Sequence, residues 1–158
     1  METAKYQIRK ATIADWDKAT ELAWKTFLKF EADEYGEEGT RHFRDFLADE
    51  MLRRMFIIGE YPMYVALDGD DYVGIISLRN KKHISLLFVD EKYHKQGIAT
   101  ALMQKMQQYV VDEYMGHILT VNAAPYATGF YHKIGFVDVA PQLMKDGIYY
   151  TPMEWVFR

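Results

Sequence analysis

The chain has 158 residues, of which 49% are hydrophobic and 15% aromatic, so we expect a folded domain with its own core and not a disordered protein. Lys and Arg number 19 against 23 Asp and Glu, and the resulting formal charge of −4 argues against general nucleic-acid binding. The absence of cysteine excludes disulfides, thiolate catalysis and cysteine zinc sites. No apolar signal segment opens the chain, and no run reaches the roughly 18 apolar residues of a membrane span. We therefore expect a soluble, cytoplasmic protein with no membrane contact.

The first part of the chain predicts one strand and two helices. Residues 6–10 alternate apolar and polar side chains, as a half-buried strand does. Residues 14–32 carry an apolar stripe at helical spacing. An acidic segment with two glycines, 31–39, follows, and a second helix is expected over 40–55.

The remainder predicts strands interleaved with helices. Strands are expected over 63–67, 72–78 and 83–89, with a hairpin turn at 68–71. Helices over 97–115 and 127–134 flank a strand at 117–121, which should run parallel to 83–89 because a helix crosses between them. The last strands are 136–139 and 148–157, joined by a loop at 141–147. With no linker or repeat, residues 1–158 are expected to form a single domain.

The segment from Leu86 to Leu102 combines an apolar strand, a polar turn and an amphipathic helix. Gly97 and Ala99 stand where that helix begins, and a helix start offers free N–H groups and a positive dipole end to an anion. Small residues there let a phosphate approach the backbone. Because the lysine of a P-loop and a GxGxxG pattern are both missing, nucleoside triphosphates and dinucleotides are poorly supported. An ordinary helix start with a small residue for packing is the plain alternative.

Two segments resemble the GNAT superfamily of N-acetyltransferases. His94-Lys95-Gln96-Gly97-Ile98-Ala99 is similar to the family's acyl-CoA motif Q/R-x-x-G-x-G/A, with His at the first position. The segment 121–136, which ends in Phe130-Tyr131-His132-Lys133-Ile134-Gly135-Phe136, resembles the family's strand-Asn…FYxxxGF segment. The resemblance covers residue 63 to the C-terminus and is greatest to small bacterial members. It implies an α/β fold with a central, mostly antiparallel sheet of about seven strands, a parallel pair splayed at the acyl-CoA site, and helices on both faces.

The resemblance also implies how acetyl-CoA, as co-substrate, would be held. Backbone N–H groups at the helix start would bind the diphosphate, and the strand that ends at Val89 would hold the pantetheine arm. The coenzyme-binding residues implied in this way are Leu87, Phe88, Val89, His94, Lys95, Gln96, Gly97, Ile98, Ala99, Thr100, Asn122 and Tyr131. Asn122, as a buried amide, could bind pantetheine or equally cap the turn before Pro125.

Two residues are candidates for proton transfer. In the family, the tyrosine at the position of Tyr131 points at the CoA sulfur and protonates the leaving thiolate; a core tyrosine with a satisfied hydroxyl is the alternative. His83 begins the strand on which histone-type members carry a glutamate base. An alkylammonium is almost wholly charged at pH 7, so the reaction needs a proton acceptor such as His83. A solvated histidine in a turn is the alternative.

Glu31, Glu34, Tyr35 and Arg79 are candidate acceptor-binding residues. The resemblance places the joint of the first two helices on the acceptor side, where carboxylates would attract a cationic amine. A solvated acidic loop explains the same residues equally well, and the choice of base between His83 and an acidic residue near Glu31 stays open.

We therefore expect an acetyl-CoA-dependent N-acetyltransferase that acetylates a primary amine of a small molecule or peptide. Direct attack in a ternary complex is expected, because no cysteine is available to form an acyl-enzyme, and the reaction needs no metal. A non-catalytic acyl-CoA-binding or regulatory module of the same fold is the alternative, and so is a structural domain that binds no coenzyme. Aromatic residues of the last strand could pair two copies in a homodimer or belong to the core.

Overall fold

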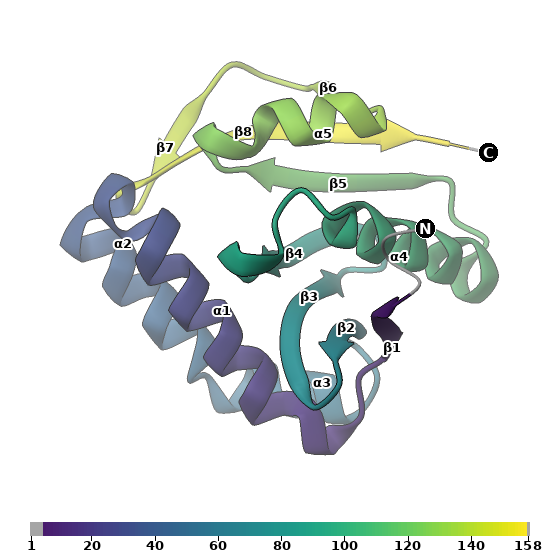
Figure 1. The fold of residues 1–158 in the computed structure, drawn as a ribbon. Coiled ribbons are helices and arrows are strands. Elements are labelled where there is room, and N and C mark those ends of the chain that lie inside the picture. Colours follow the sequence, from purple (N-terminus) through teal and green to yellow (C-terminus); the bar gives the residue numbers. More distant parts are fainter. Residues whose placement is uncertain (1–4, 158) are drawn as a thin grey trace.

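The computed structural model describes residues 5–157, which form a mixed sheet with helices on both of its faces (Figure 1). The eight strands in these residues follow the order β1-β2-β3-β4-β5-β8-β6, and β7 pairs with β8. They are β1 (Gln7–Lys10), β2 (Met63–Asp68), β3 (Asp71–Arg79), β4 (His83–Val89), β5 (Ile118–Ala123), β6 (Val137–Asp138), β7 (Leu143–Lys145) and β8 (Ile148–Val156). Only β4 and β5 are parallel among these pairs, which confirms the expected mixed sheet.

The helices lie in two groups. They are α1 (Trp16–Phe30), α2 (Ala32–Leu47), α3 (Glu50–Ile57), α4 (Ile98–Tyr114) and α5 (Thr128–Ile134), with short 3-10 turns at Ile13–Asp15, Glu91–Tyr93 and Pro125–Ala127. Alternate residues of a strand point to opposite faces. In β4, Leu86 and Phe88 pack into one core with α1 and α3, whereas Leu87 and Val89 pack against another with α4 and α5. The two groups of helices therefore cover opposite faces of the sheet, as expected.

A glycine allows α4 to lie close to the sheet. A Cβ atom at Gly74 of β3 would stand 3.1 Å from side-chain atoms of both Ile98 and Leu102. Because Ile98 is the first residue of α4, this close packing fixes where the N-terminus of α4 lies relative to β3 and β4.

The region expected as one helix over 40–55 is two helices. The Asp49 side chain accepts a hydrogen bond from the Met51 N–H at 2.8 Å and so begins a new helix, α3. The acidic segment before it is also helical, as α2, and is interrupted at Gly36, which has a φ of +69°. A capping aspartate inside an apolar periodic pattern explains the missed boundary.

The loop expected at 141–147 contains a strand. Residues of β7 pair with the start of β8 through a tight turn in which Asp146 and Gly147 have positive φ angles. The side chains of β7 are all exposed, so its sequence lacks the alternation that marks a half-buried strand. The other elements begin and end within a few residues of expectation. Among residues 5–157, no helix combines the length and apolar character that crossing a membrane requires.

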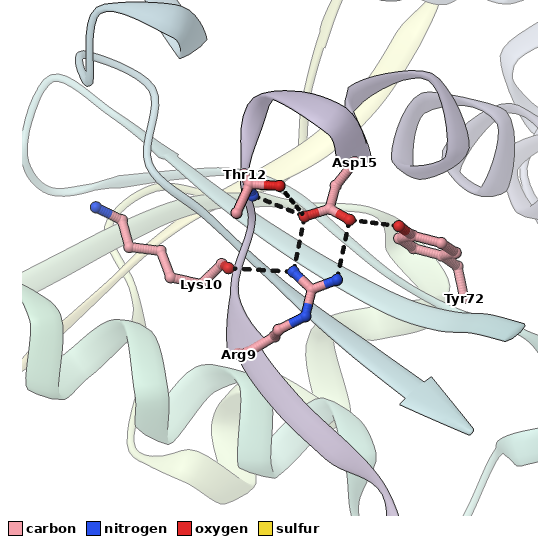
Figure 2. A network of polar contacts seen from close by, with 5 residues as sticks. All are labelled: Arg9, Lys10, Thr12, Asp15 and Tyr72. Atoms are coloured by element: carbon pink, nitrogen blue, oxygen red, sulfur yellow. Dashed lines mark hydrogen bonds and ion pairs between the residues drawn. The ribbon is translucent and has the colours of Figure 1, made fainter. Parts of the chain in front are cut away.

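A buried carboxylate holds the start of α1 to the sheet (Figure 2). Asp15, only 2% exposed, accepts hydrogen bonds from the Arg9 guanidinium at 2.7 and 3.0 Å and from the Tyr72 hydroxyl. The backbone N–H of Thr12 donates to the same carboxylate at 2.6 Å. The hydrogen bond from Arg9 above all, with those from Tyr72 and Thr12, holds the pKa of Asp15 far below its usual value against the opposing effect of burial. This network joins β1, β3 and the start of α1.

We expect Asp15→Asn to lower the free energy of unfolding by about 2 kcal/mol at pH 7. Breaking a fully buried ion pair costs about 3–5 kcal/mol, and Arg9 is partly exposed, so the loss should be smaller. Urea unfolding measures it, with Asp17→Asn, an exposed change in the same helix, as a control expected within about 0.5 kcal/mol of wild type.

The free energy of unfolding of these two variants should also depend differently on pH. Because the pKa of Asp15 is lowered in the folded state, the wild type should lose stability as the pH falls below about 4. Asp15→Asn should lose less over that range. Equal losses in Asp15→Asn and Asp17→Asn would contradict this account.

Candidate active site

The strands β4 and β5 pair over only part of their length. Their parallel register joins His83 to Thr120 and Ile84 to Val121, at the N-terminal end of β4. The next residue, Ser85, is an extra residue in β4 that shifts its register with β3. From there β4 continues along β3 while β5 diverges, so the expected splayed pair is present.

The backbone groups of Leu87 and Val89 face the edge that β5 has left. The Asp90 N–H donates to the Val73 carbonyl at 2.8 Å, so Val89 occupies a non-hydrogen-bonded position of the antiparallel ladder with β3. Alternate residues of such a ladder direct their N–H and C=O groups to opposite edges. Those of Phe88 therefore face β3, and those of Leu87 and Val89 face away from it. An extended ligand with amide groups can pair with such an edge as a strand does.

Two expected coenzyme residues lie differently from their neighbours. Phe88 turns its backbone toward β3, and its ring packs 5.8 Å from that of Phe43 in the α1–α3 core. Asn122 is exposed on β5 opposite Pro152 of β8, whereas the sequence suggested a buried amide. The Phe88 side chain is therefore part of the core, whereas Asn122 directly follows the last residue of β5 that pairs with β4 and stays a predicted coenzyme residue.

The turn after β4 leads into an open helix start. Lys95 and Gly97 have positive φ angles of 63° and 83°, a conformation that glycine adopts without strain. Gly97 is the N-cap of α4 and provides no side-chain cap, and the bond from the Ala101 N–H to the Gly97 carbonyl, at 3.0 Å, is that of the first helical turn. The N–H groups of Ile98 to Thr100 precede that bond and have no carbonyl partner within the helix. They form the kind of anion site that suits a diphosphate.

Side chains hold this turn against α1 and the N-terminal segment. Lys25 pairs with Asp90 at 3.3 Å, and Lys29 pairs with Glu91. The Gln96 side chain accepts a hydrogen bond from a tyrosine hydroxyl, that of Tyr6. The side chain of Gln96 therefore supports the turn, which leaves its backbone N–H as its means of reaching a diphosphate.

His94, which departs from the family motif, has its ring turned back toward β4. Its Nε2 atom lies 2.7 Å from the carbonyl oxygen of Val89, and its ring stacks on Phe30 with 5.2 Å between centroids. His94 thus links the turn between β4 and α4 (residues 90–97, here called the coenzyme turn) to the last residue of α1.

A buried carboxylate and three tyrosines gather at the end of α1. Glu31 is 7% exposed and accepts a hydrogen bond from the Tyr126 hydroxyl at 3.0 Å. Burial above all, and then the nearby charge of Glu31, raises the pKa of both Tyr35 of α2 and Tyr131 of α5. Three residues expected from separate parts of the sequence, Glu31, Tyr35 and Tyr131, therefore meet at one place. We call these three residues together with Tyr126 the Glu31 cluster.

The Glu31 cluster lies at the C-terminal ends of the two parted strands. Tyr126 belongs to the turn that follows β5, and Phe30 stacks on both Tyr126 and His94, which follows β4. Burial raises the pKa of Glu31, the nearby charge of Glu34 adds to the rise, and hydrogen bonds from Tyr126 and Tyr35 oppose it. Glu34 itself is exposed beside the cluster.

His83 and Arg79 lie at the opposite end of β4. His83 Nδ1 is 2.7 Å from the Thr120 hydroxyl, where β4 and β5 are still paired, and Arg79 is its partner in β3. Burial, with the charges of Arg79 and Lys82, lowers the pKa of His83 to about 4. A neutral His83 at pH 7 can accept a proton but binds it weakly, and Arg79 does not reach the Glu31 cluster as the sequence suggested.

Tyr126 is the site residue that the sequence patterns did not indicate. It lies in the turn that follows β5, and β5 has β4 as its parallel neighbour. Ligands of α/β sheets bind at the carboxyl ends of such strands, and this position was the one signal that could have pointed to Tyr126.

Comparisons with known proteins agree with this architecture. A family model described as an acetyltransferase (GNAT) domain matches residues 31–157, so the chain belongs to the GNAT acetyltransferase family. The uncharacterized N-acetyltransferase YafP of Escherichia coli (strain K12) is 32% identical over 95 residues, which are 60% of this chain and 59% of that protein. The chain thus matches a little over half the length of this curated relative.

Two solved structures share the fold. A GCN5-related N-acetyltransferase from Rhodopseudomonas palustris has a TM-score of 0.80 at 23% identity, covering 96% of this chain and 95% of that one. The PaiA N-acetyltransferase of Thermoplasma acidophilum, solved in complex with coenzyme A, has a TM-score of 0.76 at 16% identity, covering 96% and 99%. At these identities the likeness shows the fold alone.

The position of His83 predicts an unusual titration. The NMR signal of its imidazole, assigned as the one lost in His83→Gln, should titrate with a pKa of about 4. Between that value and its usual value of about 6.5 the unfolded state binds more protons, so the wild type should gain stability as the pH rises through this window. His83→Gln should gain less, and the exposed change His117→Gln serves as control. A pKa for His83 at or above 6.5 would contradict the burial described here.

Proposed function

We propose that this protein is an acetyl-CoA-dependent N-acetyltransferase that transfers the acetyl group to a primary amine by direct attack in a ternary complex. The observation that carries the proposal is the parting of β4 and β5 beside the open start of α4. Membership of the GNAT acetyltransferase family supports acetyl-CoA as the co-substrate.

The coenzyme would lie along β4 and end at α4. The pantetheine amides pair with the backbone groups of Leu87 and with the N–H of Val89, which face away from β3. The Val89 carbonyl is already occupied by the His94 ring. The diphosphate binds the N–H groups from Gln96 to Thr100, and exposed Lys95 adds a positive charge beside it. The His94 side chain holds the turn in place through Val89 and Phe30, so it is not directed at the diphosphate. Backbone N–H groups therefore bind the diphosphate here without the side chain that contributes at the first motif position in the family.

The chemistry needs a polarised carbonyl and a proton for the leaving sulfur. A backbone N–H near Val89 donates to the thioester oxygen as negative charge develops on it. The amine nitrogen bonds to the acetyl carbon, the carbon–sulfur bond breaks, and Tyr131 protonates the thiolate. Tyr131 is buried, so its hydroxyl proton is kept from bulk water and can be given to the CoA sulfur.

The acceptor side is formed by α1, α2 and the turn after β5. Glu31 and exposed Glu34 give this side a negative character, which favours a cationic amine on a small molecule or a peptide, and the neutral Tyr35 lies beside them. Exposed apolar side chains of the last strands, among them Leu143, Met144 and Tyr149, could join two copies in a homodimer.

Thr100→Glu should separate folding from coenzyme binding. Thr100 is exposed in the first turn of α4, where a glutamate favours the helix, so the melting temperature of the free protein should not fall. The new carboxylate would meet the diphosphate, and we expect the dissociation constant for acetyl-CoA, measured by calorimetry, to rise at least about tenfold. Gln104→Glu, exposed one turn later, is the matched control and should bind nearly as wild type. Equal affinity of all three proteins would argue against this diphosphate site.

Tyr131→Phe tests the proton donor. With acetyl-CoA and a panel of primary amines, we expect thiol release by this variant to fall about 10²-fold in kcat, because the thiolate loses its acid. The exposed change Tyr149→Phe should leave kcat unchanged. Full turnover by Tyr131→Phe would remove its assigned role. A wild type that binds acetyl-CoA yet releases no thiol with any amine would instead identify a non-catalytic coenzyme-binding module.

A further inference from the structure

We propose that Glu31 accepts the proton of the acceptor's ammonium group and that the Tyr126 hydroxyl holds Glu31 in position for this role. The acceptor class that fits is an alkylammonium with no carboxylate on the carbon bearing the amine. This inference rests on the acetyltransferase function proposed above and decides which of two candidates, His83 or Glu31, is the base.

The first support is the position of the carboxylate. Glu31 ends α1, and the hydroxyl of Tyr126 reaches it from the turn between β5 and α5. Tyr131, the proposed acid, is 6% exposed in the same cluster. Base and acid would therefore act from one cluster, at the open end of the parted strands, where the amine and the thioester must meet.

The second support is a buried charge without a cation. Glu31 is 7% exposed, yet within residues 5–157 it takes part in no ion pair. Tyrosine hydroxyls satisfy its oxygen atoms without neutralising its charge. A buried carboxylate is costly unless it is paired, so an arriving ammonium ion relieves that cost.

The charges around Glu31 define the acceptor further. The groups that shift its pKa are Tyr126, Tyr35 and Glu34, and Tyr131 feels its charge; none of the four is positive. A carboxylate next to the amine of the acceptor would therefore be repelled. The same surroundings raise the pKa of Glu31, which makes it a stronger proton acceptor than an exposed glutamate.

Tyr126 positions the carboxylate. Its hydroxyl donates a hydrogen bond to Glu31 at 3.0 Å, and that bond favours the charged, proton-accepting form of Glu31 against the effect of burial.

The proton balance links the two ends of the reaction. Glu31 takes one proton from the ammonium group, and the free amine then attacks the acetyl carbon. Tyr131 gives its proton to the CoA sulfur as the carbon–sulfur bond breaks, and it regains one from the new amide nitrogen. Because the charge of Glu31 raises the pKa of Tyr131, protonation of Glu31 also makes Tyr131 a better acid when the thiolate forms.

His83 fits the role of base less well. It lies where β4 and β5 are paired, its Nδ1 contacts the Thr120 hydroxyl, and it stands six positions before Val89 in β4. Phe30 and Tyr126, which mark the Glu31 cluster, lie at the other end of the strand.

The test compares Glu31→Gln with Glu21→Gln, an exposed change of the same kind inside α1. The probes are n-butylamine and 2-aminopentanoate, the same amine with a carboxylate on the amine-bearing carbon, each with acetyl-CoA. We expect kcat/KM for butylamine to fall about 10²-fold in Glu31→Gln, and its decline toward acidic pH, present in the wild type, to disappear. Glu21→Gln and His83→Gln should keep that decline. For the wild type, 2-aminopentanoate should react at least about tenfold more slowly than butylamine, because its carboxylate is repelled.

Two further readouts separate a catalytic from a structural role. Because the pKa of Glu31 is raised in the folded state, its charge opposes folding at neutral pH, so Glu31→Gln should melt at a higher temperature than the wild type at pH 8. Tyr126→Phe removes a hydrogen bond that lowers the pKa of Glu31, so the acidic limb of its pH–rate profile should move to higher pH.

The outcomes distinguish this inference from the function on which it rests. Thiol release in the wild type together with a Glu31→Gln variant that keeps turnover, keeps its acidic limb or melts lower would overturn the role of Glu31 alone. Equal rates for the two probes would overturn the acceptor class. A wild type that releases no thiol with any primary amine would overturn the proposed function and this inference together.

Discussion

The parallel pairing of β4 and β5 ends at Ile84, and the rest of the site depends on that ending. Each strand follows its own antiparallel partner beyond this point: β4 stays with β3 as far as Val89, and β5 stays with β8 along its whole length. The extra residue Ser85 marks the divergence. The result is a strand edge inside the sheet whose backbone groups have no partner in β5, directly before a helix start that suits an anion. An extended coenzyme with amides and a diphosphate matches both features.

Helix α1 connects the proposed coenzyme site to the proposed acceptor site. Its start is held to β1 and β3 through Asp15, and its last turns are held to the coenzyme turn by ion pairs to Asp90 and Glu91. Its final residue, Phe30, stacks on His94, and Glu31 follows at once. A carboxylate placed at the end of a helix that is held at several points can keep a defined position relative to the thioester.

Two buried carboxylates in this protein show opposite electrostatics. Asp15 meets a guanidinium and keeps its charge, so its pKa falls; Glu31 meets hydroxyl groups alone, so burial raises its pKa. The first arrangement stabilises the fold because its charges are paired. The second leaves a charge without a partner inside the structure, and such destabilising features concentrate at functional sites. The contrast is between a carboxylate that the protein neutralises itself and one that a ligand could neutralise.

The sequence by itself determined most of the elements, including β4 to the residue, the parallel direction of β5 and the glycine-led start of α4. These features follow from periodicity, small residues and crossover rules that act within one stretch of chain. Only the tertiary structure decided that Asn122 is exposed, that His83 contacts Thr120, and that Tyr126 meets Glu31 across 95 positions of the chain. The burial of a side chain and the partner it meets are set by how distant elements pack, and a local pattern carries no record of that packing.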